Sequence, residues 1–134
     1  MTKAHKNNIN LMNKQLRNVL LVAVALFSAQ QSHAADVAIN ATNFPDQTFR
    51  DYVLNNFDSD GDEKLSDEER AAVTSLGLGG IDDAKGVEHF TELTSINIYS
   101  GTYKTISLAS CTKLETVALN SNNKLTTVTW PAEK

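Results

Sequence analysis

Residues 93–98 read LTSINI, and the same order of apolar positions returns at 73–78 as VTSLGL and at 114–119 as LETVAL. The offsets between the three segments are 20 and 21 residues. A repeat of this length predicts a solenoid, in which each coil contributes one short strand and the apolar residues point into a shared core. The alternative is an antiparallel sheet of Thr-rich strands, because apolar residues partly alternate in LTTVTW at 125–130.

A second group of apolar residues follows in each unit, as expected when a coil turns back over its own strand. Its members are Ile81 and Val87, then Ile106 and Leu108, then Val128 and Trp130. Asn122 comes eight residues after Leu114, where leucine-rich repeats carry an asparagine whose amide satisfies backbone groups at the bend. We therefore predict leucine-rich repeats over residues 73–130 and a C-terminal tail over residues 131–134.

Three coils are about the minimum for a continuous core, and the last coil needs a polar cap. After Trp130 come Pro131, Ala132, Glu133 and Lys134. Pro131 can blunt a strand edge because it has no amide hydrogen, but this cap is thin. We expect either a marginally stable monomer or self-association through the C-terminal coil.

The segment before the repeats has a helical pattern and is acidic. Large apolar residues at helical spacing predict a helix over about residues 45–57, and Pro45 and Asp46 suit its first turn. Residues 66–69 read SDEE, which has the form of a capping box. This motif predicts a second, short helix over residues 66–72.

Residues 58–69 read DSDGDEKLSDEE, with acidic residues at the first, third, fifth and twelfth positions. This is the spacing of an EF-hand calcium loop, in which alternate side chains point inward and a distal Glu closes the shell with two oxygens. The predicted ligands are the carboxylates of Asp58, Asp60, Asp62 and Glu69 and the backbone carbonyl of Lys64. Leu65, at the eighth position, is expected to turn back into the core.

The sixth position of such a loop needs a positive φ angle and normally carries glycine, whereas this chain has Glu63. That conformation costs a non-glycine residue on the order of 1 kcal/mol, so we predict a weak Ca²⁺ site. The alternative is a solvated acidic loop followed by a capped helix. Seven acids and one Lys lie between positions 58 and 69, and their mutual repulsion favours a bound cation. No neighbouring residues supply catalytic chemistry, so the predicted role of the metal is structural.

Residues 1–34 are predicted to be a secretory signal peptide. The four basic residues of this segment precede the apolar run VLLVAVALF at 19–27, and SHA at 32–34 suits cleavage before Ala35. A transmembrane anchor is the alternative, but this run is well short of the roughly 20 residues that a span needs. The sole cysteine is Cys111, so no lipoprotein cleavage site follows the run. We expect a secreted, periplasmic or cell-surface protein without a membrane span after cleavage.

Charge and length disfavour two classes of protein. Four of the 12 Lys and Arg residues lie in the leader and all 16 Asp and Glu lie after it, which leaves a net charge near −8. This charge repels phosphate backbones and disfavours nucleic-acid binding. The 134 residues exclude a multidomain enzyme, and His89 is paired with no nucleophile in a recognised motif, so we predict no enzymatic activity. Cys111 cannot form an intramolecular disulfide and is predicted to be buried.

A resemblance to a known family rests on residues 39–53 (INATNFPDQTFRDYV), on the acidic loop, and on residues 111–117 (CTKLETV) at a repeat boundary. With these motifs the chain resembles bacterial exported leucine-rich-repeat proteins of the internalin-like, surface-protein type. The resemblance implies an α+β fold, with an EF-hand-like helix-loop-helix cap over residues 35–72 docked on a short leucine-rich-repeat solenoid of about three coils. The chain departs from the family in carrying Glu63 at the glycine position and in having few coils.

The resemblance also implies that the repeats bind other macromolecules. We expect a binding module for an extracellular or periplasmic protein or glycan, with calcium in a structural role. The alternative is a minimal calcium-binding module without a dedicated macromolecular ligand. Residues between the core positions are expected to project outward and to form the binding face. The predicted face comprises Thr94, Asn97, Tyr99, Glu115, Ala118 and Asn120.

Overall fold

The computed structural model describes residues 34–133, so the predicted signal peptide lies outside the described residues except for Ala34. The helices and strands described all belong to the unit Ala35–Lys134. None of the helices in this part of the chain has the length and apolar character that a bilayer crossing requires.

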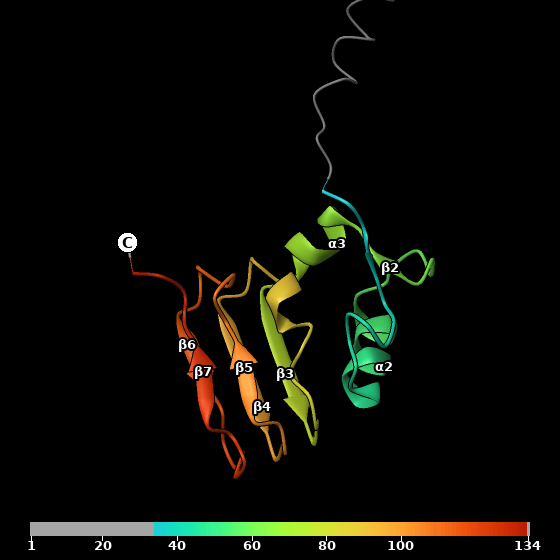
Figure 1. The fold of residues 1–134 in the computed structure, drawn as a ribbon. Helices are drawn as coiled ribbons and strands as arrows, with labels where there is room; N and C mark the ends of the chain where they lie inside the picture. The colour runs from blue at the N-terminus through green and yellow to red at the C-terminus, as the bar shows by residue number, and fades with distance from the viewer. Residues whose placement is uncertain (1–33, 134) are drawn as a thin grey trace, which may run out of the picture. The chain divides into compact units, whose positions relative to one another are not determined.

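Two α-helices, one 3₁₀-helix and seven strands make up the described part of the chain. In chain order they are β1 (Val37–Ala38), α2 (Gln47–Asn56), β2 (Lys64–Leu65), α3 (Asp67–Ala72), β3 (Ser75–Gly79), η1 (Val87–His89), β4 (Ser95–Tyr99), β5 (Thr105–Ser107), β6 (Thr116–Ala118) and β7 (Thr127–Thr129). The strands form an antiparallel pair β1-β2, a parallel sheet in the order β3-β4-β6, and a parallel pair β5-β7 (Figure 1).

Both α-helices begin at side-chain caps. The carboxylate of Asp46, before α2, accepts a hydrogen bond from the amide of Phe49 at 2.8 Å. Ser66 and Glu69 form a complete capping box at the start of α3. Phe49 and Val53 lie four residues apart on α2 and are fully buried, so one face of this helix is held by the core. The two predicted helices are confirmed to within about two residues at their ends.

The parallel sheet aligns the segments that share the apolar pattern. Leu76 on β3 lies opposite Ile96 on β4, and Ile96 lies opposite Val117 on β6, at offsets of 20 and 21 residues. Leu76 and Ile96 are buried, whereas Asn97 and Tyr99, which alternate with the buried residues of β4, are exposed. The sheet therefore has one face in the core and one face in solvent.

Asn122 joins two neighbouring turns of the chain. Its Oδ1 accepts a hydrogen bond from the amide of Gly101 at 2.8 Å, and its Nδ2 donates to the carbonyl of Ile98 at 2.9 Å. The prediction that this side chain satisfies backbone groups at a bend is confirmed. A Cβ at Gly101 would come within 2.7 Å of this Oδ1, so the bend requires glycine there.

The predicted fold class, an α+β leucine-rich-repeat solenoid beneath an EF-hand-like cap, is wrong. The described residues form mostly small sheets with two α-helices, and no solenoid is found among them. One reason is that residues 82–86 form no strand beside β5. Amides of this segment donate to side chains instead: Lys85 N to Asp83 Oδ1 and Gly86 N to Glu88 Oε2, both at 2.8 Å, and Asp82 N to Asp46 Oδ2 at 2.7 Å. The other reason is that β6 and β7 have three residues each and their apolar side chains are only partly buried.

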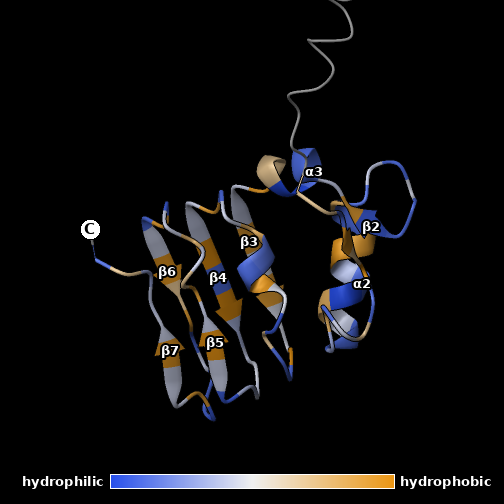
Figure 2. Ribbon diagram, turned by 45° about the horizontal axis from the view of Figure 1, so that its top comes forward, coloured by the Kyte–Doolittle hydropathy of each residue, from blue (hydrophilic) through white to orange (hydrophobic). Residues whose placement is uncertain are grey.

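A group of aromatic side chains connects the helical part to the strands. Phe44 and Phe49 pack edge to face with ring centroids 5.4 Å apart, and Phe57 packs edge to face on Phe90 at 5.5 Å. Phe90 follows η1 and leads into β4, and it lies 6.5 Å from Phe49. Figure 2 shows the hydrophobic residues as bands across the strands and on part of α2. These side chains belong to one continuous core.

Substitution of two glycines tests the junction around Phe44. Gly80 and Gly86 both have positive φ angles, 68° and 114°, but a Cβ at Gly80 meets open space whereas one at Gly86 would overlap the ring of Phe44. We expect Gly80→Ala to cost about 1 kcal/mol from backbone strain, and Gly86→Ala to cost roughly 2 kcal/mol more because the ring must move. Urea unfolding of both variants measures the difference, and equal losses would contradict the packing described.

Candidate metal site

The acidic loop connects α2 to α3 and is anchored at Leu65. Leu65 is fully buried, as predicted, and pairs with Val37 across the two-stranded sheet β1-β2. The amide of Ile39 donates to the carbonyl of Glu63 at 2.9 Å, which extends this pairing. Both ends of the loop are therefore fixed, one by the last turn of α2 and the other by β2.

Three carboxylates of the loop come together. One oxygen each from Asp58, Asp60 and Glu69 can be chosen so that all three lie within 4.8 Å of one another. This group can hold a metal ion. Glu69 also lines a cavity of about 460 Å³ together with Ser59 and Phe57, and Asp60 is exposed.

The other two predicted ligands are Asp62 and the backbone carbonyl of Lys64, and the carbonyl stays a prediction. Asp62 is not part of the three-carboxylate group; its Oδ1 accepts from the amide of Lys64 at 2.8 Å, and its Oδ2 lies 3.4 Å from Lys64 Nζ. Lys64 itself lies in β2, opposite Ala38. Because both side chains of the Asp62–Lys64 pair are substantially exposed, this pair contributes little to stability.

Backbone amides hold the converging carboxylates in place. Asp58 Oδ1 accepts from the amide of Gly61 at 2.8 Å, and Asp58 Oδ2 accepts from that of Glu63 at 3.0 Å. Glu69 Oε1 accepts from both the amide and the hydroxyl of Ser59 at 2.7 Å, and Glu69 Oε2 accepts from the amide of Ser66 at 2.9 Å. These donors stabilise the ionised form of the carboxylates at a point where they repel one another.

The hydrogen bonds act on the acidity of Glu69. The hydroxyl of Ser59 has the largest effect, with the amides of Ser66 and Ser59 adding to it, and together they lower the pKa of Glu69 to about 2 against the opposing effect of burial. Sequence analysis did not identify Ser59 as a functional residue. No local sequence pattern predicts that Ser59 bonds to Glu69, because the two residues are ten positions apart in the chain.

The turn of the loop has the conformation that its pattern predicts. Glu63 has a φ angle of 61° and Gly61 has one of 75°. The left-handed conformation at Glu63 confirms that glycine is preferred at this position. A non-glycine residue in this conformation is destabilised by on the order of 1 kcal/mol. The donor set, three carboxylates on one loop, is the chemistry of a hard, oxygen-binding cation.

Two residues of the predicted binding face, Asn97 and Tyr99, lie on the solvent side of the β3-β4-β6 sheet, whereas Ala118 is half-buried. Asn97 and Ala118 are direct neighbours in register, and Tyr99 lies opposite Gly79. A Cβ at Gly79 would come within 2.5 Å of the Tyr99 ring, so the exposed ring lies over the glycine.

Three further residues of the predicted face lie at the ends of its strands. Thr94 and Glu115 directly precede β4 and β6, and the amide of Glu115 donates to the carbonyl of Thr94 at 2.8 Å. Asn120 follows β6, and its carbonyl accepts from the amide of Ser100 at 3.1 Å. The predicted face did not include residues of β3, although Ser75 and Gly77 are exposed there. The alternation of polar or small and apolar residues in SLGLG could have indicated them.

Cys111 is buried, as predicted, and does not contribute a reactive group. Its Sγ lies 3.4 Å from the carbonyl of Phe90. Burial raises the pKa of the thiol to about 11, with the charge of Glu88 adding to the effect. Little thiolate is present at neutral pH in the folded protein.

Comparison with protein families found no family that matches the chain, and comparison with curated proteins found no match either.

The lowered pKa of Glu69 predicts a pH dependence of stability in the presence of a chelator. Above pH of about 4.5 Glu69 is ionised in the folded and unfolded states, and its contribution is complete. Between about 4.5 and 2 the unfolded state takes up the proton first, so this contribution is lost as the pH falls. We expect Glu69→Gln to flatten the fall in melting temperature over this range and Asp51→Asn, on the exposed side of α2, to leave it unchanged. An unaltered slope in Glu69→Gln would show that Ser59 and Ser66 do not bind the carboxylate.

Proposed function

We propose that the loop at residues 58–69 binds a calcium ion, which stabilises the fold of a module that acts outside the cytoplasm. The observation that carries this proposal is the convergence of carboxylate oxygens from Asp58, Asp60 and Glu69 within 4.8 Å. The predicted signal peptide supports the location, since extracellular modules use calcium sites with weak affinity.

Calcium fits this loop better than magnesium does. Calcium accepts six to eight oxygen ligands in a flexible geometry, so the three carboxylates and further oxygens from the backbone or water satisfy it. Magnesium needs near-ideal octahedral geometry and retains its waters. The carboxylates of this loop already accept several amide hydrogen bonds, which fix their orientation and disfavour such strict geometry. When bound, the ion neutralises carboxylates that otherwise repel one another at short range.

The residues of the loop have separate parts in this proposal. Asp58, Asp60 and Glu69 provide oxygens, while Ser59 orients the Glu69 carboxylate. Glu69 also caps α3, so an ion at its carboxylate would connect the end of α2 to the start of α3. Glu63 keeps the affinity low because its left-handed conformation is strained.

Calcium titration of the melting temperature tests the proposal. Calcium at ten times its dissociation constant should add roughly 1.4 kcal/mol of stability by mass action. We expect Glu63→Gly to strengthen this response by relieving strain, and Glu69→Gln to abolish it. Asp51→Asn removes one carboxylate from the same helical region outside the group and is the matched control. The absence of any calcium-dependent shift in both the parent chain and Glu63→Gly would leave only the solvated acidic loop.

A second candidate function is recognition of a protein or glycan by the exposed face of the β3-β4-β6 sheet. It is favoured by Tyr99, which is 52% exposed, lies over Gly79 and is flanked on β4 by the exposed amide side chain of Asn97. An exposed aromatic ring beside amide groups suits the apolar face of a sugar or a side chain of a protein partner.

A glycan array with two aromatic variants tests this face. If the face binds a glycan, Tyr99→Ala should weaken the signal by about tenfold or more, as expected for a central aromatic contact. Trp130→Ala is the matched control, because Trp130 is 55% exposed but lies beyond β7 and outside this sheet. Equal losses in the two variants would count against the face, and full binding by Tyr99→Ala would exclude Tyr99 from it.

A further inference from the structure

Strands β6 and β7 are the last strands of their sheets, and their outer edges are open. The larger sheet has the order β3-β4-β6, and β7 is the outer strand of the pair β5-β7. Figures 1 and 2 both show β6 and β7 at the end of the row of strands that lies farthest from α2. Within residues 34–133, no strand pairs with either outer edge.

The outward backbone groups of β6 belong to Val117 and Leu119. The amide of Thr116 donates to the carbonyl of Thr94 at 3.1 Å, and the carbonyl of Asn120 accepts at 3.1 Å from the residue after β4. Parallel pairing uses alternate residues, so the even-numbered positions bond toward β4. The amides and carbonyls of Val117 and Leu119 therefore point to the open side, and no hydrogen bond to them is found in the described part of the chain.

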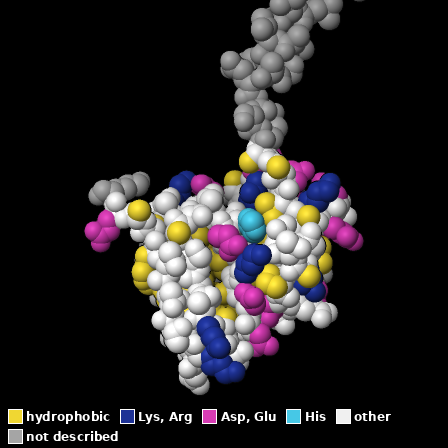
Figure 3. All heavy atoms as spheres, in the orientation of Figure 1, with side chains coloured by type: hydrophobic (Ala, Val, Ile, Leu, Met, Phe, Trp, Pro, Cys, Tyr) yellow, Lys and Arg dark blue, Asp and Glu magenta, His cyan; other side chains and the backbone are white. Residues whose placement is uncertain are grey.

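Apolar side chains at this end are less buried than their counterparts one strand further in. The three apolar side chains of residues 93–98 are fully buried, whereas those at the same positions of residues 114–119 are only partly buried. Trp130 follows Val128 by two residues and is 55% exposed. Figure 3 shows hydrophobic atoms along the margin of the molecule where β6 and β7 lie in Figure 1. The partly buried members of this group are Leu114, Val117, Leu119, Leu125 and Val128.

The charge at this end favours a second copy of the chain as the occupant. Residues 111–134 contain three Lys and two Glu, whereas residues 35–110 contain five Lys or Arg and fourteen Asp or Glu. In Figure 3, Asp and Glu side chains follow one another down the middle of the drawn face. Two copies of an acidic chain repel each other least when they meet through the part that carries almost no net charge.

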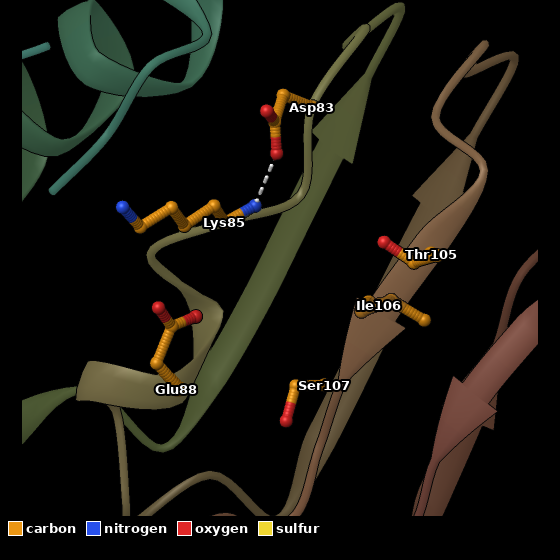
Figure 4. Close-up of a pocket in the computed structure, with 6 residues that line it drawn as sticks. All are labelled: Asp83, Lys85, Glu88, Thr105, Ile106 and Ser107. Carbon is orange, nitrogen blue, oxygen red and sulfur yellow. Dashed lines mark hydrogen bonds between the residues drawn. The ribbon is translucent and has the colours of Figure 1, made fainter. Parts of the chain in front are cut away.

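Other strand edges are less suited to pairing with a second copy. The inner side of β5 is close to η1, and Asp83 and Glu88 lie on the η1 side of the space between them (Figure 4). On β7, Pro131 follows Trp130 and has no amide hydrogen to donate. Residues 114–120 of β6 and its flanks contain neither Pro nor Lys, and Glu115 is the one charged residue among them. The edge of β6 is therefore the one on which another strand can pair.

We propose that two copies of the chain associate through this end, with β6 of one copy pairing antiparallel with β6 of the other across a two-fold axis. A two-fold axis makes the contact self-complementary and sets a strand antiparallel to its own copy. The partly buried side chains of the two copies then cover one another and cover Trp130. This contact does not involve the acidic loop, so the inference stands independently of the proposed calcium site.

The free backbone groups define the register of this pairing. When Val117 of each copy lies opposite Leu119 of the other, all the outward amides and carbonyls of both residues are bonded. A register with Val117 opposite itself would set Leu119 against Glu115, whose amide already donates to the carbonyl of Thr94 at 2.8 Å. The first register places Ala118 directly opposite Ala118 of the second copy.

A disulfide tests this register. Ala118 and its copy form a pair without mutual hydrogen bonds, in which the Cα atoms are about 4.5 Å apart, and a disulfide spans that distance. We expect Ala118→Cys to give a covalent dimer on air oxidation, seen by non-reducing electrophoresis. The matched control is Asn97→Cys, which lies beside Ala118 one strand further in and should stay monomeric. Cys111 is buried and does not compete. Equal cross-linking of both variants, or none in Ala118→Cys, would overturn the proposal.

Sedimentation and tryptophan fluorescence test the association without a cross-link. Trp130 is the sole tryptophan, so its emission reports on this end of the molecule. Because the contact is small, we expect a monomer–dimer equilibrium at about 10–500 μM, with emission moving to shorter wavelength over the same range. A monomer at every concentration, or a dimer with unchanged emission, would contradict the proposed contact.

Charge placed at the centre of the contact should weaken it. Ala118→Lys sets two like charges directly opposite each other and should reduce the association constant about two- to fivefold, while Asn97→Lys should leave it unchanged. Equal weakening by the two variants would reflect net charge alone and reject the contact. If Ala118→Lys does not fold, which its melting curve shows, the cysteine pair still decides the question.

Calcium separates this contact from one made through the acidic loop. The dimer should form equally in calcium and in chelator, whether or not the loop binds the ion. A dimer that forms only with calcium would be bridged through the carboxylates of the loop, and this result would reject the pairing of β6.

Discussion

The contact of Phe44 and Phe49 with Phe90 is the constraint on which the rest of the described structure depends. All three rings are fully buried, and Phe90 lies 6.3 Å from Phe44 and 6.5 Å from Phe49 between ring centroids. Burial of each ring contributes about 1.5–3 kcal/mol, more than an exposed ion pair such as Lys113–Glu92. Because Phe90 lies only a few residues before β4, this packing joins the helical segment to the parallel sheet in one core.

The same packing places the acidic loop. Val53 fixes the last turns of α2 and Leu65 returns the chain to the core, so the residues between them must turn within a short span. The carboxylates of Asp58 and Glu69 are thereby brought together although they repel each other. Amide and hydroxyl donors of the loop offset part of this repulsion, and a bound cation would offset the remainder. The geometry of the site is thus imposed by hydrophobic burial and only adjusted by its polar contacts.

Local patterns in the sequence predicted local structure well. The capping box at Ser66 and Glu69, the left-handed turn at Glu63 and the burial of Leu65 all follow from rules that act over a few residues. The bonding of Ser59 to Glu69 could not be predicted, because it depends on how two helices are brought together. The apolar spacing of Leu76, Ile96 and Val117 matches the register of three strands, but spacing says nothing of whether the pairing continues around a closed coil.

Where the pairing stops is decided by competition for backbone amides. The carboxylates of Asp83 and Glu88 accept hydrogen bonds from the amides of Lys85 and Gly86, and the chain turns there instead of forming a strand. An unpaired edge invites association between identical chains, and charged residues beside it usually prevent this. With a net charge near −8 after residue 34, a second copy of the chain is repelled by the carboxylates of Asp83 and Glu88.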